Sequence, residues 1–372
     1  MSVAALLLSL ALSTAPAAAP LPTDTEPPLC APAAQLSELA GCPAWGPGAL
    51  QAQYAAAQLP AEIPALPTEK LTRPAKILDA AYARVLTPDA PVFASPEAAA
   101  AGAAARTLGR GFVFVQTVAA EQAGDLALYK IRSGEFIRAA DVEAVEPSGF
   151  QGLRLTARPA YPFGWLVAST RPSPAPGVPA SPDVKRLARY RVVQIFATVR
   201  VGAWNWYLVG PGQWVEQRAV SVVSFHPPPD GVTGAWIQVD LYEQTLVAYE
   251  GAEPVYATLV SSGLDKWATE PGLFEVYARL RDDRMRGAYA PDKSDYYYLE
   301  AVPYVLYFDG DRALHGQYWH DRLGFKRSHG CVNLAPLDAR WLYGWAAMGT
   351  PVWVYDPSQP ADVKAESAAI GP

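Results

Sequence analysis

Apolar and polar residues alternate in short runs over the last third of the chain. Ile237, Val239 and Leu241 alternate with Gln238 and Asp240, as in a strand that buries one face. Other short apolar runs predict strands at residues 245–249, 255–260, 274–280, 304–308 and 352–355. We therefore expect a β-rich domain over residues 235–356.

One helix is predicted within this domain, over residues 336–347. Pro336 suits the first turn of a helix, where its missing N–H is not needed. Leu337, Trp341 and Trp345 follow at steps of four residues and so share one face of that helix. We interpret this face as part of the hydrophobic core and not as a ligand site.

A second β-rich region with a weak internal repeat precedes this domain. Residues 129–137 resemble residues 207–215, and each copy has a strand, a glycine turn and an aromatic–aliphatic pair. The spacing is typical of two small β-barrel units, over residues 78–150 and 151–225. Prolines at 227–229 mark the boundary with the last domain. The fold class that we expect is mainly β.

The two ends of the chain differ from the rest in composition. A short apolar run and an Ala-rich stretch indicate a signal peptide over residues 1–20, with an Ala-rich unstructured start as the alternative. Residues 21–77 are rich in Ala and Pro and predict an arm or linker, and residues 357–372 a tail. The apolar run is too short to span a bilayer, so we expect an exported protein without a membrane span.

Charge and cysteine content narrow the function further. The formal net charge is −6, which gives no reason to expect a nucleic-acid partner. The chain has three cysteines, Cys30, Cys42 and Cys331. In an oxidising compartment the first two can pair, which would leave Cys331 as a free thiol.

Cys331 lies in a segment that also holds three of the four histidines. A thiol is a weak nucleophile at neutral pH unless a base takes its proton, and an imidazole such as His315 is such a base. A base of this kind predicts an apparent thiol pKa below the free value of about 8.5. Gly330 allows a substrate to approach closely, and N–H groups around it and Cys331 can receive an oxyanion.

A zinc site is the main alternative for the same residues. His315 and His320 are five residues apart, which is the wrong step for two ligands on one helix face. No motif supplies a pair of carboxylates, and we interpret His320 as a surface or loop residue. The sequence therefore favours thiol chemistry without a metal. A catalytically inactive binding domain is a further alternative.

The arrangement of these residues is that of a known family. A His-Gly pair at His315 and a Ser-His-Gly-Cys block that ends at Cys331, 16 residues later, resemble the signature of L,D-transpeptidase catalytic domains of the YkuD type. The resemblance covers about residues 235–356. It implies that Cys331 is the nucleophile, that His315 is its base, and that the backbone carbonyl of Gly316 orients the imidazole.

The resemblance also implies roles for the neighbouring residues. Ser328, His329 and Gly330 would shape and support the oxyanion site.

Other positions would contact the substrate. Asn333 would contact the substrate or act as a local brace, and Tyr318 and Trp319 would line the mouth of the pocket. Residues 279–298 have few strand signals and fall where relatives carry a flap over the substrate.

The implied reaction is acyl transfer on peptidoglycan in the periplasm or cell wall, without a cofactor. The donor would be a tetrapeptide stem that forms a thioester with Cys331. The acceptor would be an amine of a second stem, which gives a 3→3 crosslink, or another amine such as a lipoprotein lysine or a free D-amino acid. An L,D-carboxypeptidase that passes the acyl group to water is one alternative. The upstream units resemble bacterial SH3-like modules, so a cell-wall-binding protein that acts through them is another. A third possibility is that these units have only a structural role and hold the catalytic domain in place.

Overall fold

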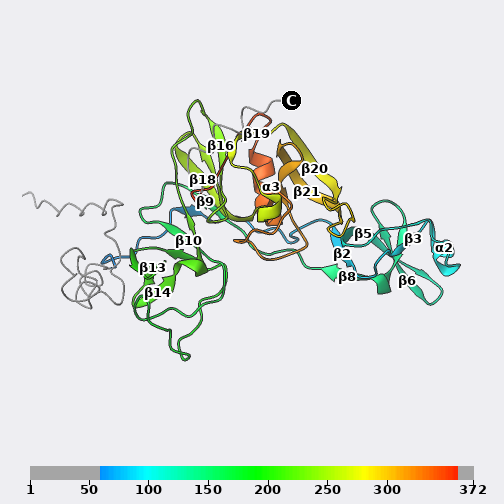
Figure 1. Ribbon diagram of the computed structural model, residues 1–372, viewed down its shortest axis with the longest axis horizontal. Helices are drawn as coiled ribbons and strands as arrows, with labels where there is room; N and C mark the ends of the chain where they lie inside the picture. The colour runs from blue at the N-terminus through cyan, green and yellow to red at the C-terminus, as the bar shows by residue number, and fades with distance from the viewer. Residues whose placement is uncertain (1–58, 359–372) are drawn as a thin grey trace, which may run out of the picture. The chain divides into compact units, whose positions relative to one another are not determined.

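The computed structural model describes residues 59–358, all of which lie in one compact unit. This part of the chain is built mainly of strands, as predicted (Figure 1). The predicted signal peptide, most of the predicted arm and nearly all of the predicted tail lie outside the described residues.

The C-terminal half has strands at the predicted places, except that the segment 274–280 is divided between two strands with different partners. A hairpin of β16 (Ala235–Asp240) and β17 (Thr245–Glu250) is followed by β18 (Glu253–Ser261). Strand β24 (Pro351–Tyr355) pairs in parallel with β16, and β19 (Gly272–Glu275) pairs with β24. The sheet order is therefore β19–β24–β16–β17–β18.

A second group of strands continues from the end of β18. Val260 and Ser261 of β18 pair with β23 (Val332–Leu334), which pairs in parallel with β22 (Arg312–Gly316). Beyond β22 lie the two long antiparallel strands β21 (Tyr297–Asp309) and β20 (Ala278–Gly287). Strand β18 therefore belongs to both groups of strands and connects them.

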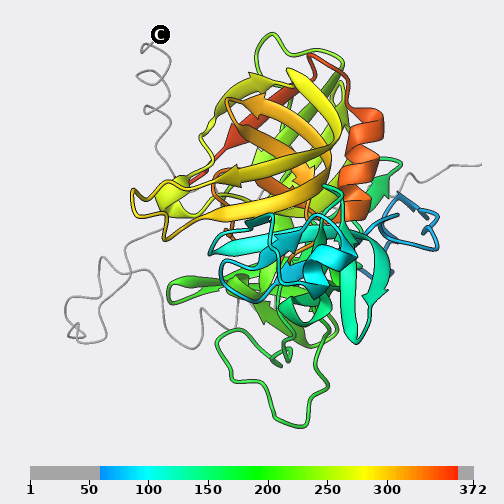
Figure 2. The same ribbon diagram turned by 90° about the vertical axis from the view of Figure 1, so that its right-hand side faces the viewer.

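The core between these strands is filled by aliphatic side chains and one helix. Helix α3 spans Pro336–Trp345, begins with its proline as predicted, and ends two residues earlier than expected. Ala339 and Leu342 of α3 join the core cluster with Ile237 of β16 and Leu314 of β22. Figure 2 shows α3, in orange, packed beside the curved yellow and orange strands.

A buried carboxylate attaches α3 to the sheet. Asp338 is fully buried and accepts hydrogen bonds from the hydroxyls of Tyr256 (2.6 Å) and Thr258, both in β18. The backbone N–H of Gly152 donates a third bond to it at 2.8 Å. Burial raises the pKa of Asp338 to about 6 in spite of these donors.

Replacing Asp338 by asparagine should stabilise the protein at neutral pH. In the unfolded chain Asp338 loses its proton near its ordinary pKa of 3.8, whereas the buried group keeps it up to about pH 6. The folded state thus binds more protons within this window, so wild-type stability falls as the pH rises through it. The fall amounts to about 3 kcal/mol as an upper estimate. Urea midpoints measured at pH values from about 4 to about 7 give this fall in the free energy of unfolding.

The asparagine variant keeps the essential contacts. Its amide oxygen still accepts from Gly152 and Tyr256, and its amide N–H₂ can donate to the Thr258 hydroxyl. Asp125→Asn, at an exposed turn, is the matched control and should keep the wild-type pH dependence. An Asp338→Asn profile as steep as that of the wild type would show that another group titrates.

The first upstream unit is a small antiparallel β structure. Its long hairpin of β5 and β6 pairs with β2 on one side and β7 on the other. Its elements are β2 (Ala81–Val85), β3 (Pro91–Phe93), α2 (Pro96–Ala100), β4 (Arg106–Thr107), β5 (Phe112–Ala123), β6 (Leu126–Ile131), β7 (Phe136–Arg138), the 3₁₀ helix η2 (Ala139–Asp141) and β8 (Val142–Val145).

The second upstream unit contains two three-stranded sheets. One has the order β11–β10–β15 and the other the order β12–β13–β14. Its elements are β10 (Phe163–Leu166), β11 (Val192–Gln194), β12 (Ala197–Val201), β13 (Trp204–Gly210), β14 (Gln213–Glu216), the 3₁₀ helix η3 (Gln217–Ala219) and β15 (Val220–Val223).

The end of each unit follows the same order of elements. In both, a hairpin leads to a short strand, a three-residue 3₁₀ helix and a last strand. The 3₁₀ helices begin at Ala139 and Gln217, and the last strands begin at Val142 and Val220, so both pairs are 78 residues apart. That is the offset seen in the sequence. The assignment of these units as SH3-like modules stays a prediction.

Several strand pairings cross the boundaries that we expected between domains. Strand β9 (Leu153–Leu155) falls within the segment assigned to the second unit, yet it pairs with Tyr256 and Ala257 of β18 and with β1 (Thr68–Glu69). Phe112 of β5 pairs in parallel with Tyr297 of β21. The upstream segments therefore complete the edges of the C-terminal sheets.

Candidate active site

The two parallel strands β22 and β23 bring the predicted nucleophile and base together. His315 is the fourth residue of β22 and lies opposite Asn333 of β23, while Cys331 immediately precedes β23. Side chains two residues apart on a strand point to the same face. Cys331, Asn333 and His315 therefore share one face of the sheet, with the thiol and the imidazole on adjacent strands.

The His315 ring is held in one orientation. It is buried, with 2% of its surface exposed, and its Nδ1 lies 3.1 Å from the carbonyl oxygen of Gly316. A carbonyl oxygen only accepts, so Nδ1 carries the proton and Nε2 has a free lone pair. The Trp319 ring packs against the imidazole with centroids 5.8 Å apart. Nε2 is thus the atom available to accept a proton.

Burial sets the charge of both partners. It lowers the pKa of His315 to about 4 and raises the pKa of the half-buried Cys331 thiol to about 11. Asp311 also raises the thiol pKa, while the Ala313 backbone and Arg312 lower it. This direction is opposite to the lowered thiol pKa that the sequence predicted. Burial favours the neutral form of each group, a thiol and a neutral imidazole.

The loop before Cys331 is fixed by hydroxyl groups. The Ser328 hydroxyl donates to the Cys331 carbonyl and accepts from the Gly330 N–H at 3.1 Å. The Thr269 hydroxyl donates to the Gly330 carbonyl at 2.7 Å and accepts from the Gly263 N–H at 2.9 Å. Because the Gly330 N–H is already engaged by Ser328, an oxyanion here would need other donors.

Two features of the structure favour glycine at position 330. Its φ is +115°, in a region that residues with a side chain rarely adopt. A Cβ atom at this position would also lie 3.1 Å from the Arg312 guanidinium. Asp309 anchors Arg312 through a 2.6 Å ion pair, and Glu270 lies 3.5 Å from it. Sequence reasoning missed Arg312, because no motif contains it.

His329 lies in an aromatic cluster. Its ring is 3.7 Å from that of Trp267, 5.1 Å from that of Tyr297 and 5.8 Å from that of Tyr289, centroid to centroid. Burial lowers its pKa, and its Nε2 is buried without a hydrogen-bond partner in the described part of the chain. Only the Tyr run at 296–298 hinted at this cluster in the sequence.

About half of the predicted flap is regular structure. Residues 279–287 and 297–298 belong to the hairpin of β20 and β21, and residues 288–296 form its loop. Charged residues along β20 hid its strand character in the sequence. In the loop, the Tyr289 hydroxyl lies 3.4 Å from the carbonyl oxygen of His329. The tip of the hairpin thus reaches the loop that carries the cysteine.

The prediction that Tyr318 lines the pocket mouth is wrong. Its ring is fully buried and stacks on Tyr82 with centroids 3.7 Å apart, and its hydroxyl donates to the Glu300 carbonyl at 2.7 Å. It therefore packs the joint between the first upstream unit and β21. Trp319 is half-buried beside His315, so it remains a candidate for contact with the substrate.

The side chains of Asn333 and His320 lie against each other. Asn333 is buried, and its amide Nδ2 lies 3.4 Å from Nε2 of His320. The backbone N–H of Arg322 donates to Nδ1 of His320 at 3.2 Å, and burial lowers the pKa of His320 to about 4. His320 is half-buried in a loop, so the loop alternative holds and the surface alternative does not. The geometry favours the brace role of Asn333 over substrate contact.

Two kinds of feature are absent from residues 59–358. No helix there is long and apolar enough to cross a membrane. No three His, Cys, Asp or Glu side chains gather there in an arrangement that could hold a metal ion.

Comparison with known proteins identifies the segment that carries this site. The family model described as the L,D-transpeptidase catalytic domain, YkuD, matches residues 234–354. The Bacillus subtilis protein named "Putative L,D-transpeptidase YciB" is 28% identical, over 29% of this chain and 59% of its own length. The chain thus spans less than two thirds of that relative.

Two solved structures are similar over about the same share of the chain. The L,D-transpeptidase of Stackebrandtia nassauensis is 28% identical over 37% of this chain and 63% of its own, with a TM-score of 0.29. The catalytic domain of the E. faecium L,D-transpeptidase is 27% identical over 34% of this chain and 99% of its own, with a TM-score of 0.30. The family model and the curated relative together identify residues 234–354 as a catalytic domain of the L,D-transpeptidase family.

Proposed function

We propose that this protein is a cysteine acyltransferase that acts on peptidoglycan stem peptides. Cys331 would form a thioester with a tetrapeptide stem and pass the acyl group to an amine of a second stem, which makes a 3→3 crosslink. The observation that carries the proposal is the His315 ring, whose Nδ1 bonds to the Gly316 carbonyl and whose Nε2 is left to serve the thiol on the adjacent strand.

In the first half of the reaction the thiol attacks the carbonyl of the third stem residue. The Cys331 Sγ–H proton passes to Nε2 of His315 as the S–C bond forms. The tetrahedral intermediate then collapses, the C–N bond breaks, and the proton on His315 goes to the leaving nitrogen. The terminal D-amino acid departs, and a thioester remains on Cys331.

The second half reverses these roles. An acceptor amine attacks the thioester carbonyl and gives a proton to His315, and the C–S bond breaks as that proton returns to sulfur. Water in place of the amine would give the carboxypeptidase reaction. The half-buried thiol and the aromatic residues Trp319 and Tyr297 near it limit access of water, which favours transfer over hydrolysis.

The orientation of the His315 ring suits this mechanism. Its Nδ1–H bonds to the Gly316 carbonyl, so the Nε2 lone pair can accept the thiol proton. Ser328 and Thr269 would keep the Cys331 loop in place throughout, because both of their hydroxyls bond to its backbone. The Cys331 N–H is the oxyanion donor that we propose, with the Arg312 guanidinium next to it.

Purified disaccharide-tetrapeptides provide the direct test. We expect the wild-type protein to convert two of them into a crosslinked dimer with loss of one terminal D-amino acid, as read by mass spectrometry. Shortened monomers without dimers would establish the hydrolase instead. Absence of both products under conditions where the protein is folded would overturn the proposal.

The cellular place of the enzyme follows from the substrate. Since stem peptides are crosslinked outside the cytoplasm, the proposal includes export to the periplasm or cell wall, directed by the predicted signal peptide of residues 1–20.

A further inference from the structure

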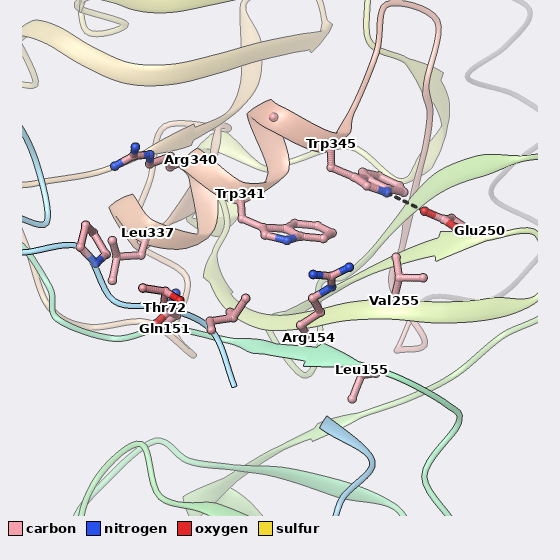
Figure 3. Close-up of a pocket in the computed structure, with 13 residues that line it drawn as sticks. Thr72, Gln151, Arg154, Leu155, Glu250, Val255, Leu337, Arg340, Trp341 and Trp345 are labelled. Atoms are coloured by element: carbon pink, nitrogen blue, oxygen red, sulfur yellow. Dashed lines mark hydrogen bonds between the residues drawn. The ribbon is translucent and has the colours of Figure 1, made fainter. Parts of the chain in front are cut away.

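A groove of about 740 Å³ lies away from the candidate active site. Its walls come from α3, from β9, from the adjoining ends of β17 and β18, and from residues 71–74 of the arm (Figure 3). Neither Cys331 nor His315 lines it. Val255 lines the groove and precedes Ser261, the residue of β18 that pairs with β23, by six positions. Six positions correspond to about 20 Å along a strand.

Two tryptophans of α3 form one wall of the groove. The Trp341 ring stacks on the buried Tyr256 with centroids 4.0 Å apart, and the Trp345 ring stacks on Trp341 at 5.6 Å and 16°. The Trp345 indole N–H donates to Glu250 at 3.3 Å. Leu337 is buried, and both half-buried indoles pack against the hydrophobic core as predicted, while the rest of their surface lines the groove.

Planar polar side chains face these rings. Figure 3 shows the Arg154 guanidinium between the tryptophans and the opposite wall. Arg154 forms an ion pair with Glu69 at 3.1 Å, so the charge on this wall is largely balanced. The side chains of Gln151 and Arg340, also in the lining, make no hydrogen bond or ion pair within residues 59–358.

A glycine in α3 keeps the groove open. Gly344 lies between the two tryptophans in the sequence, has helical dihedral angles and lines the groove. A Cβ atom at this position would meet nothing within 4 Å, so packing inside the protein does not require a glycine. Glycine costs about 1 kcal/mol relative to alanine in a helix interior. The space above it is what a side chain would take away.

We propose that this groove binds the glycan strand of peptidoglycan. The C–H face of a pyranose ring packs on the outer face of the Trp345 indole, because Trp341 is already stacked between Tyr256 and Trp345. The hydroxyl and acetamido groups of the sugar pair with planar side chains such as Arg154 and Gln151. A purely apolar ligand would leave those polar groups unpaired. An anionic ligand would find Arg154 paired with Glu69, and Arg340 offset by Glu250 in the same lining. The choice of polymer rests on the proposed function.

A groove that binds the same polymer as the active site would bring the enzyme to its substrate. The glycan strand carries the stems, so binding it in the groove holds stems near Cys331 and raises their local concentration. The site would therefore matter for the intact wall and for glycan-linked stems. It would not matter for free stem peptides, which have no sugar to bind.

Filling the groove tests the proposal without damage to the fold. In Gly344→Leu the new side chain enters open space and improves helix propensity, so we expect an unchanged or higher Tm. The probe is end-labelled glycan strands from which all stem peptides have been removed, followed by fluorescence anisotropy with the full chain. We expect wild-type binding and an affinity loss of about tenfold or more in the variant. Trp345→Ala should weaken binding as well.

The controls separate this proposal from the proposed enzyme activity. Ala100→Leu adds the same side chain at an exposed position of α2 and should bind like the wild type. Gly344→Leu should process free stem peptides at the wild-type rate. No wild-type binding to stripped strands, or equal binding by Gly344→Leu, overturns the groove proposal whatever the enzyme does. Wild-type binding without turnover of any stem would instead overturn the proposed enzyme function alone.

Discussion

Replacing Cys331 by alanine should abolish acyl transfer while the protein stays folded. The side chain is half-buried at the edge of an apolar cluster, and alanine removes only its sulfur atom. Loss of the nucleophile from a catalytic pair lowers kcat by on the order of 10⁶. Dimer formation from disaccharide-tetrapeptides measures the loss, and the urea midpoint checks the fold.

Two further variants make the result specific. Cys331→Ser keeps the geometry but should be nearly inactive, because a hydroxyl is much harder to deprotonate with the same imidazole. The double variant Cys30→Ala/Cys42→Ala removes the other two thiols together and should keep full activity. Substantial turnover by Cys331→Ala would mean that another residue forms the acyl-enzyme.

The next largest effect is expected for His315→Gln. Removing a general base slows a reaction by about 10²–10⁴. Glutamine can still donate to the Gly316 carbonyl but cannot take a proton, so the variant separates proton transfer from packing. His226→Gln is the matched control: His226 contacts the Tyr355 hydroxyl at 3.1 Å, away from Cys331, and glutamine can keep that contact.

The pH profile should distinguish a neutral pair from an ion pair. With a His315 pKa of about 4, the base is neutral above about pH 5, so kcat/KM should be flat between about pH 5 and 8. Protonation of His315 should cut the rate only near pH 4, well below the range in which an ordinary histidine titrates. Loss of activity centred near pH 6.5 would show that burial does not control this group.

Alkylation of Cys331 by iodoacetamide reports the thiol directly. With a thiol pKa of about 11, the rate should still be rising at pH 9, in the wild type and in His315→Gln alike. A rate that levels off near pH 7 in the wild type and not in the variant would establish a thiolate–imidazolium pair.

Local patterns predicted the regular elements of the C-terminal domain well. Alternation located β16, and a proline located the start of α3, because both signals act over a few residues. Strand β20 was missed because its arginines and aspartates hide the alternation. The pairing of β9 with β18 joins residues about a hundred positions apart, and no local pattern carries that information.

The sequence predicted most of the residues that form the candidate site, but it did not predict the direction of the thiol pKa or the burial of Tyr318. The motif led to Cys331, His315 and Gly316, and the sheet register puts the first two on adjacent strands. The direction of the thiol pKa was missed, because desolvation depends on what packs around the sulfur. Tyr318 was misplaced for a similar reason, since its partner Tyr82 lies far away in the chain.

The burial of Cys331 has a consequence for the lifetime of the enzyme. Peroxides and disulfides react with a thiolate and only slowly with a protonated thiol. A free cysteine with a low pKa would be oxidised more readily in the oxidising compartment that we propose for this enzyme. A nucleophile that ionises only while it attacks a bound acyl donor is protected for the rest of the time. The same packing that slows alkylation would thus help to keep the enzyme reduced.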